Sequence, residues 1–178
     1  MIIQSENLLK TTRPVKIAVL TISDSRTLED DTSGKKLVEM ITNDGHHIAE
    51  RLLVTDDIYQ IRYQISRWII DPEVEAIITT GGTGLTGRDG TPEAVRPLFD
   101  REIDGFGGLF RQLSYDTVGT STIASRAVGG VANGTFIFTL PGSTGACKDA
   151  WNGILTHQLN HTYKPCNLVE LMPRLTEK

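Results

Sequence analysis

A glycine-rich stretch followed by an aspartate offers the clearest chemistry in this sequence. Residues 81–84 read Gly-Gly-Thr-Gly, and Arg88 and Asp89 follow in the same polar loop. Glycines have no Cβ, so backbone N–H groups can approach an anion such as a phosphate closely. An aspartate beside phosphates is unfavourable unless a cation lies between them, which points to Mg²⁺ as the partner of Asp89. Considered alone, the glycines are explained at least as well by a tight turn without a ligand.

A second carboxylate is available at Asp56, which comes directly after a predicted strand. It is a candidate second Mg²⁺ ligand, since this ion takes one or two carboxylates and completes its shell with water and phosphates. The alternative is structural, because Asp56 and Asp57 together also form a favourable helix N-terminus. Arg88 and Arg126 are candidates to neutralise a phosphate, and each is equally suited to an exposed ion pair.

A third polar turn has the sequence Pro141-Gly142-Ser143-Thr144 and precedes a predicted helix. A phosphate at this helix start would gain about 0.3–1 kcal/mol from the helix dipole, in addition to direct hydrogen bonds. Simple capping of the helix by Ser143 or Thr144 is the alternative. Lys148, one turn into the helix, is a candidate point charge, although a lone lysine is more often solvated.

Regular elements must position these residues. Apolar runs predict strands at residues 15–22, 47–54, 76–80 and 135–140. Capping residues and apolar spacing predict helices that begin near Asp31, Asp56-Asp57, Thr91 (through its hydroxyl) and Ser143, another around 106–113, and a short one over 121–128 that ends at Gly129-Gly130. The alternation of strands and helices indicates an α/β fold with a mostly parallel central sheet covered by helices on both faces.

The ends of three predicted strands carry polar turns, at residues 21–26, 81–89 and 141–144. In sheets of this kind, ligands bind outside the carboxyl ends of the strands, so the three turns are expected to meet at one edge. This convergence favours a phosphate- or nucleotide-binding site over a turn without a ligand.

The composition limits the remaining options. The chain has 178 residues, 39% of them hydrophobic, and a net charge of −4. This length suits one domain, expected at residues 14–165 between an N-terminal arm (1–13) and a C-terminal tail (166–178). We expect no nucleic-acid binding, because no basic tract is present, and no membrane span. Two cysteines without metal-ligand spacing and no signal peptide suggest the cytoplasm.

Several catalytic motifs are absent from the sequence. It contains neither a Gly-x-x-x-x-Gly-Lys-Ser/Thr loop nor a Gly-x-Ser-x-Gly nucleophile elbow, and its four histidines show no metal-like grouping. The chemistry that remains is positioning and electrostatic stabilisation with Mg²⁺, as in phosphoryl or nucleotidyl transfer.

The motifs together resemble the molybdenum cofactor biosynthesis family and its molybdopterin-binding domain. The run from Thr80 to Ala94, Thr-Gly-Gly-Thr-Gly-Leu-Thr-Gly-Arg-Asp-Gly-Thr-Pro-Glu-Ala, looks like the family signature. Leu140-Pro-Gly-Ser-Thr, Ser125-Arg-Ala and Leu20-Thr-Ile-Ser-Asp also fit, and the similarity covers about residues 14–165. The protein B branch of the family is the most similar, through Gly119-Thr-Ser-Thr and Phe99-Asp-Arg-Glu.

This resemblance implies a three-layer α/β/α sandwich that assembles as a homotrimer or a dimer of trimers. It implies an adenylyl transfer in which Mg-ATP and molybdopterin give adenylyl-molybdopterin and pyrophosphate, with Asp56 and Asp89 as catalytic residues and Mg²⁺ ligands. The residues expected to bind the pterin and the nucleotide are Ser23, Asp24, Gly81, Gly82, Thr83, Gly84, Arg88, Ser125, Arg126, Pro141, Gly142, Ser143, Thr144 and Lys148.

Two departures from the family pattern matter. Thr144 stands where the turn more often has a second proline, which makes the turn less rigid. The protein B branch is also not uniformly active, and the presence of both Asp56 and Asp89 favours activity here. The alternatives are a molybdopterin- or nucleotide-binding protein of the same pathway without turnover, and a purely structural partner of other molybdenum cofactor biosynthesis proteins.

Overall fold

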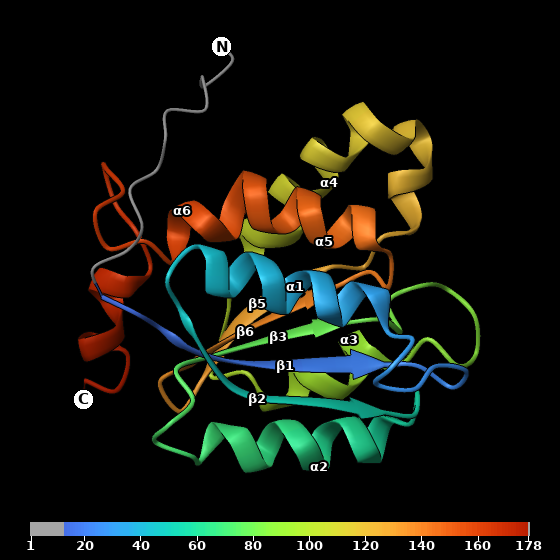
Figure 1. Ribbon diagram of the computed structural model, residues 1–178, viewed down its shortest axis with the longest axis horizontal. Helices are drawn as coiled ribbons and strands as arrows, with labels where there is room; N and C mark the ends of the chain where they lie inside the picture. The colour runs from blue at the N-terminus through green and yellow to red at the C-terminus, as the bar shows by residue number, and fades with distance from the viewer. Residues whose placement is uncertain (1–12, 178) are drawn as a thin grey trace.

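The fold is built on one mixed sheet, seen in a computed structural model that describes residues 13–177 (Figure 1). The predicted N-terminal arm, apart from Arg13, lies outside this range. Six strands pair in the order β2-β1-β3-β6-β5-β4. They are β1 (Lys16–Ile22), β2 (His47–Val54), β3 (Ala76–Thr80), β4 (Arg101–Glu102), β5 (Val128–Ala132) and β6 (Thr135–Leu140). The four strands β2, β1, β3 and β6 are parallel, whereas β5 runs antiparallel to both of its neighbours.

Helices cover both faces of the sheet, which confirms the predicted three-layer α/β/α sandwich (Figure 1). One face carries α1 (Thr32–Asn43), α4 (Asp104–Val118) and α5 (Thr144–Ala150), and the other carries α2 (Ile58–Ile69) and α3 (Thr91–Val95). After α5 the chain continues through a π-helical turn, η3 (Trp151–Leu155), into α6 (Thr156–Gln158). Short 3₁₀ turns complete the chain at η1 (Arg96–Leu98), η2 (Gly119–Ala124) and η4 (Val169–Arg174).

The alternating side chains of the central strands account for two separate cores. In β3, Ala76 and Ile78 pack toward α1, α4 and α5, whereas Ile77 packs toward α2 and α3. All three side chains are fully buried. Burial of an isoleucine of this kind contributes about 1.5–3 kcal/mol relative to exposure, so the register of the strand is strongly specified.

Two predictions about local structure are wrong. Residues 119–124 form a 3₁₀ turn, and Gly129 and Gly130 lie in strand β5 rather than ending a helix at residue 128. Two phenylalanines explain why glycines occupy these positions. A Cβ at Gly130 would lie 2.4 Å from the ring of Phe99, and one at Gly129 would lie 3.1 Å from Phe106. The strand therefore needs two positions without side chains so that the aromatic rings can pack against it.

The second wrong prediction concerns Thr91, whose hydroxyl does not cap a helix. Helix α3 begins at Thr91 itself, with Gly90 at the capping position and no side-chain cap. The Thr91 Oγ1 atom donates a hydrogen bond to the carbonyl oxygen of Gly81 at 2.9 Å. It thereby ties the helix start to the beginning of the glycine-rich loop.

The residues predicted as a C-terminal tail include an apolar segment that packs on the sandwich. Val169 is buried in the larger core, and Leu168 and Met172 pack against it. The side chain of Asn167 donates to the carbonyl oxygens of His161 and Tyr163. This part of the chain therefore adds to the core that α1, α4 and α5 form.

A buried ion pair lies beneath the start of α1. The Asp31 carboxylate is fully buried and contacts Arg51 at 2.8 Å. It also accepts hydrogen bonds from Thr21 Oγ1 and from the backbone N–H of Gly34. Burial alone would raise the pKa of Asp31, but these hydrogen bonds, led by that of Arg51, lower it below its usual value.

We expect Asp31→Asn to destabilise the protein by about 3 kcal/mol at neutral pH, because removing one partner leaves the buried side of Arg51 uncompensated. A group with a lowered pKa stabilises the fold above its unfolded-state pKa of about 4, and this contribution is lost as the pH falls through the folded-state value. The difference in unfolding free energy between wild type and Asp31→Asn, measured in urea, should therefore shrink below about pH 4. Glu29→Gln, at an exposed position nearby, serves as the control, and a difference that does not change with pH would contradict the assignment.

Candidate functional site

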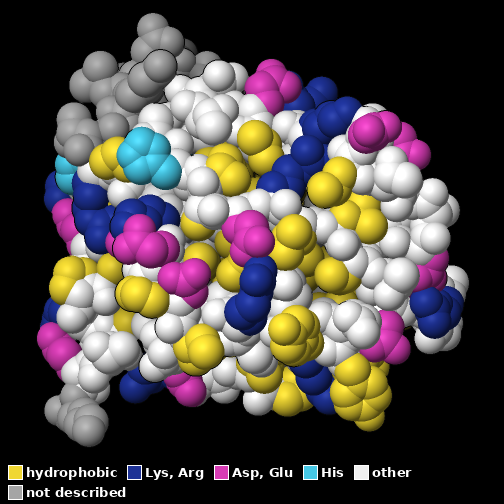
Figure 2. Space-filling view, turned by 60° about the horizontal axis from the view of Figure 1, so that its bottom comes forward, with side chains coloured by type: hydrophobic (Ala, Val, Ile, Leu, Met, Phe, Trp, Pro, Cys, Tyr) yellow, Lys and Arg dark blue, Asp and Glu magenta, His cyan; other side chains and the backbone are white. Residues whose placement is uncertain are grey.

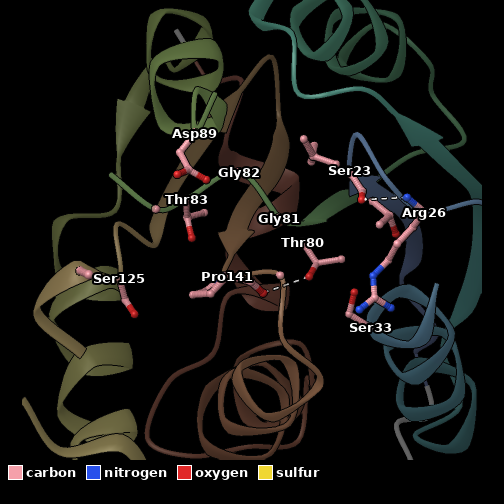
Figure 3. A pocket seen from close by; sticks show the side chains of 15 residues that line it. Ser23, Arg26, Ser33, Thr80, Gly81, Gly82, Thr83, Asp89, Ser125 and Pro141 are labelled. Atoms are coloured by element: carbon pink, nitrogen blue, oxygen red, sulfur yellow. Dashed lines mark hydrogen bonds between the residues drawn. The ribbon is translucent and has the colours of Figure 1, made fainter. Parts of the chain in front are cut away.

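A cleft of about 370 Å³ opens at the carboxyl edge of the parallel strands (Figure 3). The strand register explains why the predicted turns meet there: Thr21 in β1 pairs with Thr80 in β3, and Thr80 pairs with Leu140 in β6. The three turns therefore start at the same level of the sheet. A fourth wall comes from Ala124 and Ser125. These residues precede β5, which is antiparallel and so begins at the edge where the parallel strands end.

The structure places most of the predicted binding residues around this cleft. Those that line it are Ser23, Gly81, Gly82, Thr83, Gly84, Asp89, Ser125, Pro141 and Gly142. The predicted residues that do not line it are Asp24, Asp56, Arg88, Arg126, Ser143, Thr144 and Lys148.

The glycines of the loop are required by the backbone as well as by any ligand. Gly81 has a φ of +112° and Gly82 a φ of +64°, and L side chains rarely adopt either. A Cβ at Gly81 would lie only 2.1 Å from the carbonyl oxygen of Ile22, at the end of β1. At Gly82 it would meet Thr91 Oγ1 at 2.2 Å and an oxygen of Asp56 at 2.7 Å. The loop therefore packs directly on the neighbouring strand end.

Asp89 is the carboxylate that lines the cleft (Figure 3). One of its oxygens accepts hydrogen bonds from the Thr86 N–H at 2.8 Å and from the Thr86 hydroxyl at 2.5 Å. These bonds are the largest cause of a pKa below the usual value for aspartate, so the group is ionised at neutral pH. A partly exposed carboxylate beside a glycine-rich backbone fits the oxygen ligands that Mg²⁺ prefers, and Asp89 would hold the ion at this place.

Asp56 lies behind the loop rather than in the cleft. Its carboxylate approaches Gly82 and accepts a long hydrogen bond, 3.3 Å, from the backbone N–H of Gly90. Partial burial is the main cause of its raised pKa, and the nearby charges of Asp89 and Asp24 raise it further. Within residues 13–177, no three side chains of the kinds that bind metals are grouped closely enough to hold an ion. A contribution of Asp56 to Mg²⁺ binding therefore stays a prediction.

Arg88 is engaged in an ion pair at the rim of the cleft. Its Nε and Nη2 atoms donate to the two carboxylate oxygens of Asp24, at 2.9 and 2.8 Å. Asp24 also accepts a hydrogen bond from the backbone N–H of Asp56 at 3.0 Å. The hydrogen bond from Arg88, followed by that from Asp56, lowers the pKa of Asp24. The pair links the turn after β1 to the glycine-rich loop, and the structure favours the ion-pair alternative for Arg88.

Arg126 fastens both ends of the same loop. Its Nε donates to the carbonyl oxygens of Gly84 at 2.7 Å and Thr83 at 3.3 Å, and its Nη2 donates to that of Asp89 at 2.6 Å. Its Nη1 forms an ion pair with Glu93 in α3. All three nitrogens of the guanidinium are therefore occupied by the protein, so this conformation leaves Arg126 unsuited to bind a phosphate.

The turn after β6 contributes backbone rather than hydroxyl groups to the cleft. Ser143 Oγ accepts a hydrogen bond from the Ala146 N–H at 3.1 Å, which is the capping alternative. Thr144 Oγ1 lies 3.4 Å from the hydroxyl of Thr32 in α1. Lys148 is exposed on α5 outside the cleft lining. A binding role for these side chains would need them to move.

Sequence reasoning did not single out Arg26, Ser33 and Thr80, which also line the cleft. The Thr80 hydroxyl donates to the carbonyl oxygen of Pro141 at 3.0 Å and so joins two of the turns. Arg26 is bent back toward the start of α1, where its Nη1 donates to the Asp30 carbonyl oxygen and to Thr32 Oγ1. Its place in the first polar turn was the only signal in the sequence.

Residues 82–87 match a dinucleotide-binding fingerprint in sequence, but the structure shows that they do not form the corresponding loop. Gly82-Thr-Gly84-Leu-Thr-Gly87 agrees letter by letter with the Gly-x-Gly-x-x-Gly fingerprint of dinucleotide-binding proteins. That fingerprint requires the last glycine for close packing of the helix on the strand. Here a Cβ at Gly87 would have no atom within 4 Å, and the helix begins only at Thr91. The loop is therefore of another type.

The fold and the cleft define an α/β protein with a cleft at the carboxyl edge of its parallel strands, built mostly from loop backbone. The chain matches the family described as "Probable molybdopterin binding domain" over residues 18–161. It therefore belongs to this molybdopterin-binding-domain family, which confirms the resemblance to molybdenum cofactor biosynthesis proteins.

Individual relatives agree with this assignment. The chain is 51% identical over 154 residues to molybdenum cofactor biosynthesis protein B of Escherichia coli K12, covering 86% of this chain and 91% of that one. It is 44% identical to the protein of the same name from Staphylococcus aureus MRSA252, covering 86% and 92% of the two chains.

Solved structures show the same fold. A crystal structure of molybdenum cofactor biosynthesis protein B superposes with a TM-score of 0.85 at 38% identity, covering 91% of this chain and 98% of that one. The tungsten cofactor synthesizing protein MoaB from Pyrococcus furiosus gives 0.73 at 34% identity, covering 82% and 92%. No helix of residues 13–177 combines the length and the apolar character that a membrane crossing requires.

Proposed function

We infer that the protein acts in molybdenum cofactor biosynthesis and propose that it adenylylates molybdopterin with Mg-ATP in the cleft. The inference of the pathway rests on the relatives named above. Both are molybdenum cofactor biosynthesis proteins, and the match covers almost the whole length of each. The observation that carries the proposed reaction is the position of Asp89, an ionised carboxylate facing a cleft walled by glycine backbone. This combination suits a ligand that brings both phosphates and a divalent cation.

In the proposed reaction, the terminal phosphate of molybdopterin attacks the α-phosphorus of ATP. A new P–O bond forms there, the bond between the α-phosphorus and the bridging oxygen breaks, and pyrophosphate leaves. Backbone N–H groups of Gly82 and Thr83 would orient the phosphates, and Asp89 would hold the cation. Bound Mg²⁺ supplies neutralisation of charge on the ATP phosphates. Arg126 keeps the loop in shape through its three carbonyl contacts.

The test is pyrophosphate release by the purified protein. With ATP, Mg²⁺ and molybdopterin we expect pyrophosphate to form in proportion to molybdopterin, and none when either Mg²⁺ or molybdopterin is omitted. The mass of the pterin product should rise by one adenylyl group. A protein that binds molybdopterin but releases no pyrophosphate would refute adenylyl transfer.

One observation favours a second candidate, a molybdopterin-binding protein without turnover. Only one carboxylate lines the cleft among the described residues, because Asp56 lies behind Gly82. This candidate requires pterin binding of similar strength with and without ATP. The pyrophosphate assay separates the two functions, since only adenylyl transfer forms pyrophosphate.

The proposal extends to assembly as a homotrimer or a dimer of trimers in the cytoplasm. Large apolar side chains are exposed on the outer side of α4 and η2, where Tyr115 and Val118 lie near Ile123, which is 84% exposed. The opposite side of the molecule also carries hydrophobic side chains spread among charged ones (Figure 2). There α2 contributes Tyr59 and Tyr63. The apolar surface of α4 and η2 is of a kind that subunit contacts cover.

A further inference from the structure

Several arginines around the cleft are paired with carboxylates. Within residues 13–177, three of the arginines at or next to the cleft form ion pairs, which are Arg88 with Asp24, Arg126 with Glu93, and Arg51 with Asp31. Each of these guanidinium groups binds a carboxylate from another segment near the cleft. Arg26, the arginine among the cleft-lining residues, forms no ion pair with a carboxylate in this part of the chain. Arg111, which donates to the carbonyl oxygen of Ser125, lies outside the lining.

The surroundings of Arg26 orient its guanidinium without neutralising it. Its Nη1 atom donates to the main-chain oxygen of Asp30 at 3.1 Å and to Thr32 Oγ1 at 3.0 Å, both uncharged acceptors. The Asp30 carboxylate is turned away, since it accepts hydrogen bonds from the N–H and the hydroxyl of Thr27. The Nε and Nη2 atoms of Arg26 have no partner in the described part of the chain and remain available to a ligand.

The two charged residues that line the cleft, both without an ion-pair partner among the described residues, lie at its opposite ends. Arg26 lies on the side of α1, and Asp89 lies on the side of the glycine-rich loop, with Gly81 and Gly82 between them (Figure 3). Arginine matches a phosphate with two parallel N–H groups, which gives direction as well as attraction. A ligand that carries a phosphate at one end is thus fixed in one of its two orientations.

We propose that Arg26 binds the phosphate monoester of the acceptor substrate, a residue role that rests on the proposed function. The line from Arg26 to Asp89 then places the acceptor phosphate first, the α-phosphorus of ATP next and the departing pyrophosphate at the Asp89 end. This order is the one that in-line displacement requires, since attacking and leaving oxygens lie on opposite sides of the phosphorus. Arg26 sets the orientation of the acceptor substrate, whereas Asp89 lies at the end from which pyrophosphate leaves.

The test compares two fluorescent probes, hydroxymethylpterin phosphate and the unphosphorylated hydroxymethylpterin. Their dissociation constants are measured without ATP for wild type, Arg26→Gln, Arg26→Lys and Lys36→Gln. Lys36 is the matched control, because it lies on α1 and pairs with Glu39 on the surface. The ratio of the two dissociation constants measures the contribution of the phosphate group to affinity. A change that weakens binding of both probes equally leaves this ratio unaltered.

We expect wild type and Lys36→Gln to bind the phosphorylated probe about 10-fold more tightly, the range of a charge-assisted hydrogen bond. In Arg26→Gln this preference should fall below about 3-fold, and Arg26→Lys should keep an intermediate ratio. An unchanged ratio in Arg26→Gln, or no preference in wild type, overturns the inference. Both dissociation constants are measured without turnover. Absence of pyrophosphate release would therefore refute the proposed reaction, whereas the role of Arg26 would still be decided by the ratio of the two constants.

Discussion

Asp89→Asn is expected to lower Mg²⁺-dependent turnover by about 100-fold or more, because a charge that offsets the cation is lost at the reacting phosphates. The substitution is almost isosteric. An asparagine oxygen can still accept the hydrogen bonds that Thr86 donates through its N–H and its hydroxyl. The fold and the loop should therefore persist, and the measured effect belongs to the carboxylate charge. The measurements are the rate of pyrophosphate release and the affinity for Mg²⁺ by calorimetry in the presence of ATP.

Asp116→Asn is the matched control for Asp89→Asn. Asp116 is exposed on α4, outside the cleft lining, so this variant removes the same charge from a distant surface. It should retain wild-type turnover and affinity for Mg²⁺. Undiminished turnover in Asp89→Asn would remove Asp89 from the mechanism.

Gly81→Ala is expected to destabilise the protein by about 3 kcal/mol or more, from backbone strain of about 1–3 kcal/mol and overpacking of a similar size. The native φ of +112° is unfavourable for alanine. The added Cβ would lie 2.1 Å from the carbonyl oxygen of Ile22, so one of two strand ends must shift. Chemical denaturation at fixed protein concentration measures the effect. Pterin binding should weaken as well, since the loop would leave its position.

The same loop supplies a control for Gly81→Ala. A Cβ at Gly87 would have no atom within 4 Å, and its φ is not positive, so Gly87→Ala should change the unfolding free energy by no more than about 0.5 kcal/mol. Equal stability of the two variants would show that the contact with Ile22 does not constrain the loop.

Much of the sheet could be predicted, because the central strands are buried on both faces. The predicted strands at 47–54, 76–80 and 135–140 coincide with β2, β3 and β6. Strands of this kind consist of continuous apolar runs, which are visible without knowledge of their neighbours. The prediction was wrong for β5, because Val-Gly-Gly-Val-Ala has too few side chains to show a strand pattern. The strand packs against Phe99 and Phe106, which come from elsewhere in the chain.

The location of the cleft was accessible from the sequence, but the roles of its side chains were less so. Topology brings strand ends together, and hence Ser23, Gly82 and Pro141 could be placed at one edge. The partners of a long side chain are not encoded by spacing. Arg126 contacts Asp89, 37 residues earlier, whereas Arg26 donates to uncharged acceptors close by in the sequence.

The contacts of Arg126 also affect the order in which the molecule can be completed. They connect Thr83, Gly84 and Asp89 with a single residue 37 to 43 positions later in the chain. Arg126 follows α4 and η2 and lies just before β5. Until β5 has paired beside β6, the loop lacks this tether, and contacts of such sequence separation form against a cost in chain entropy. The shape of the loop that walls the cleft thus depends on the segment that leads into the antiparallel half of the sheet.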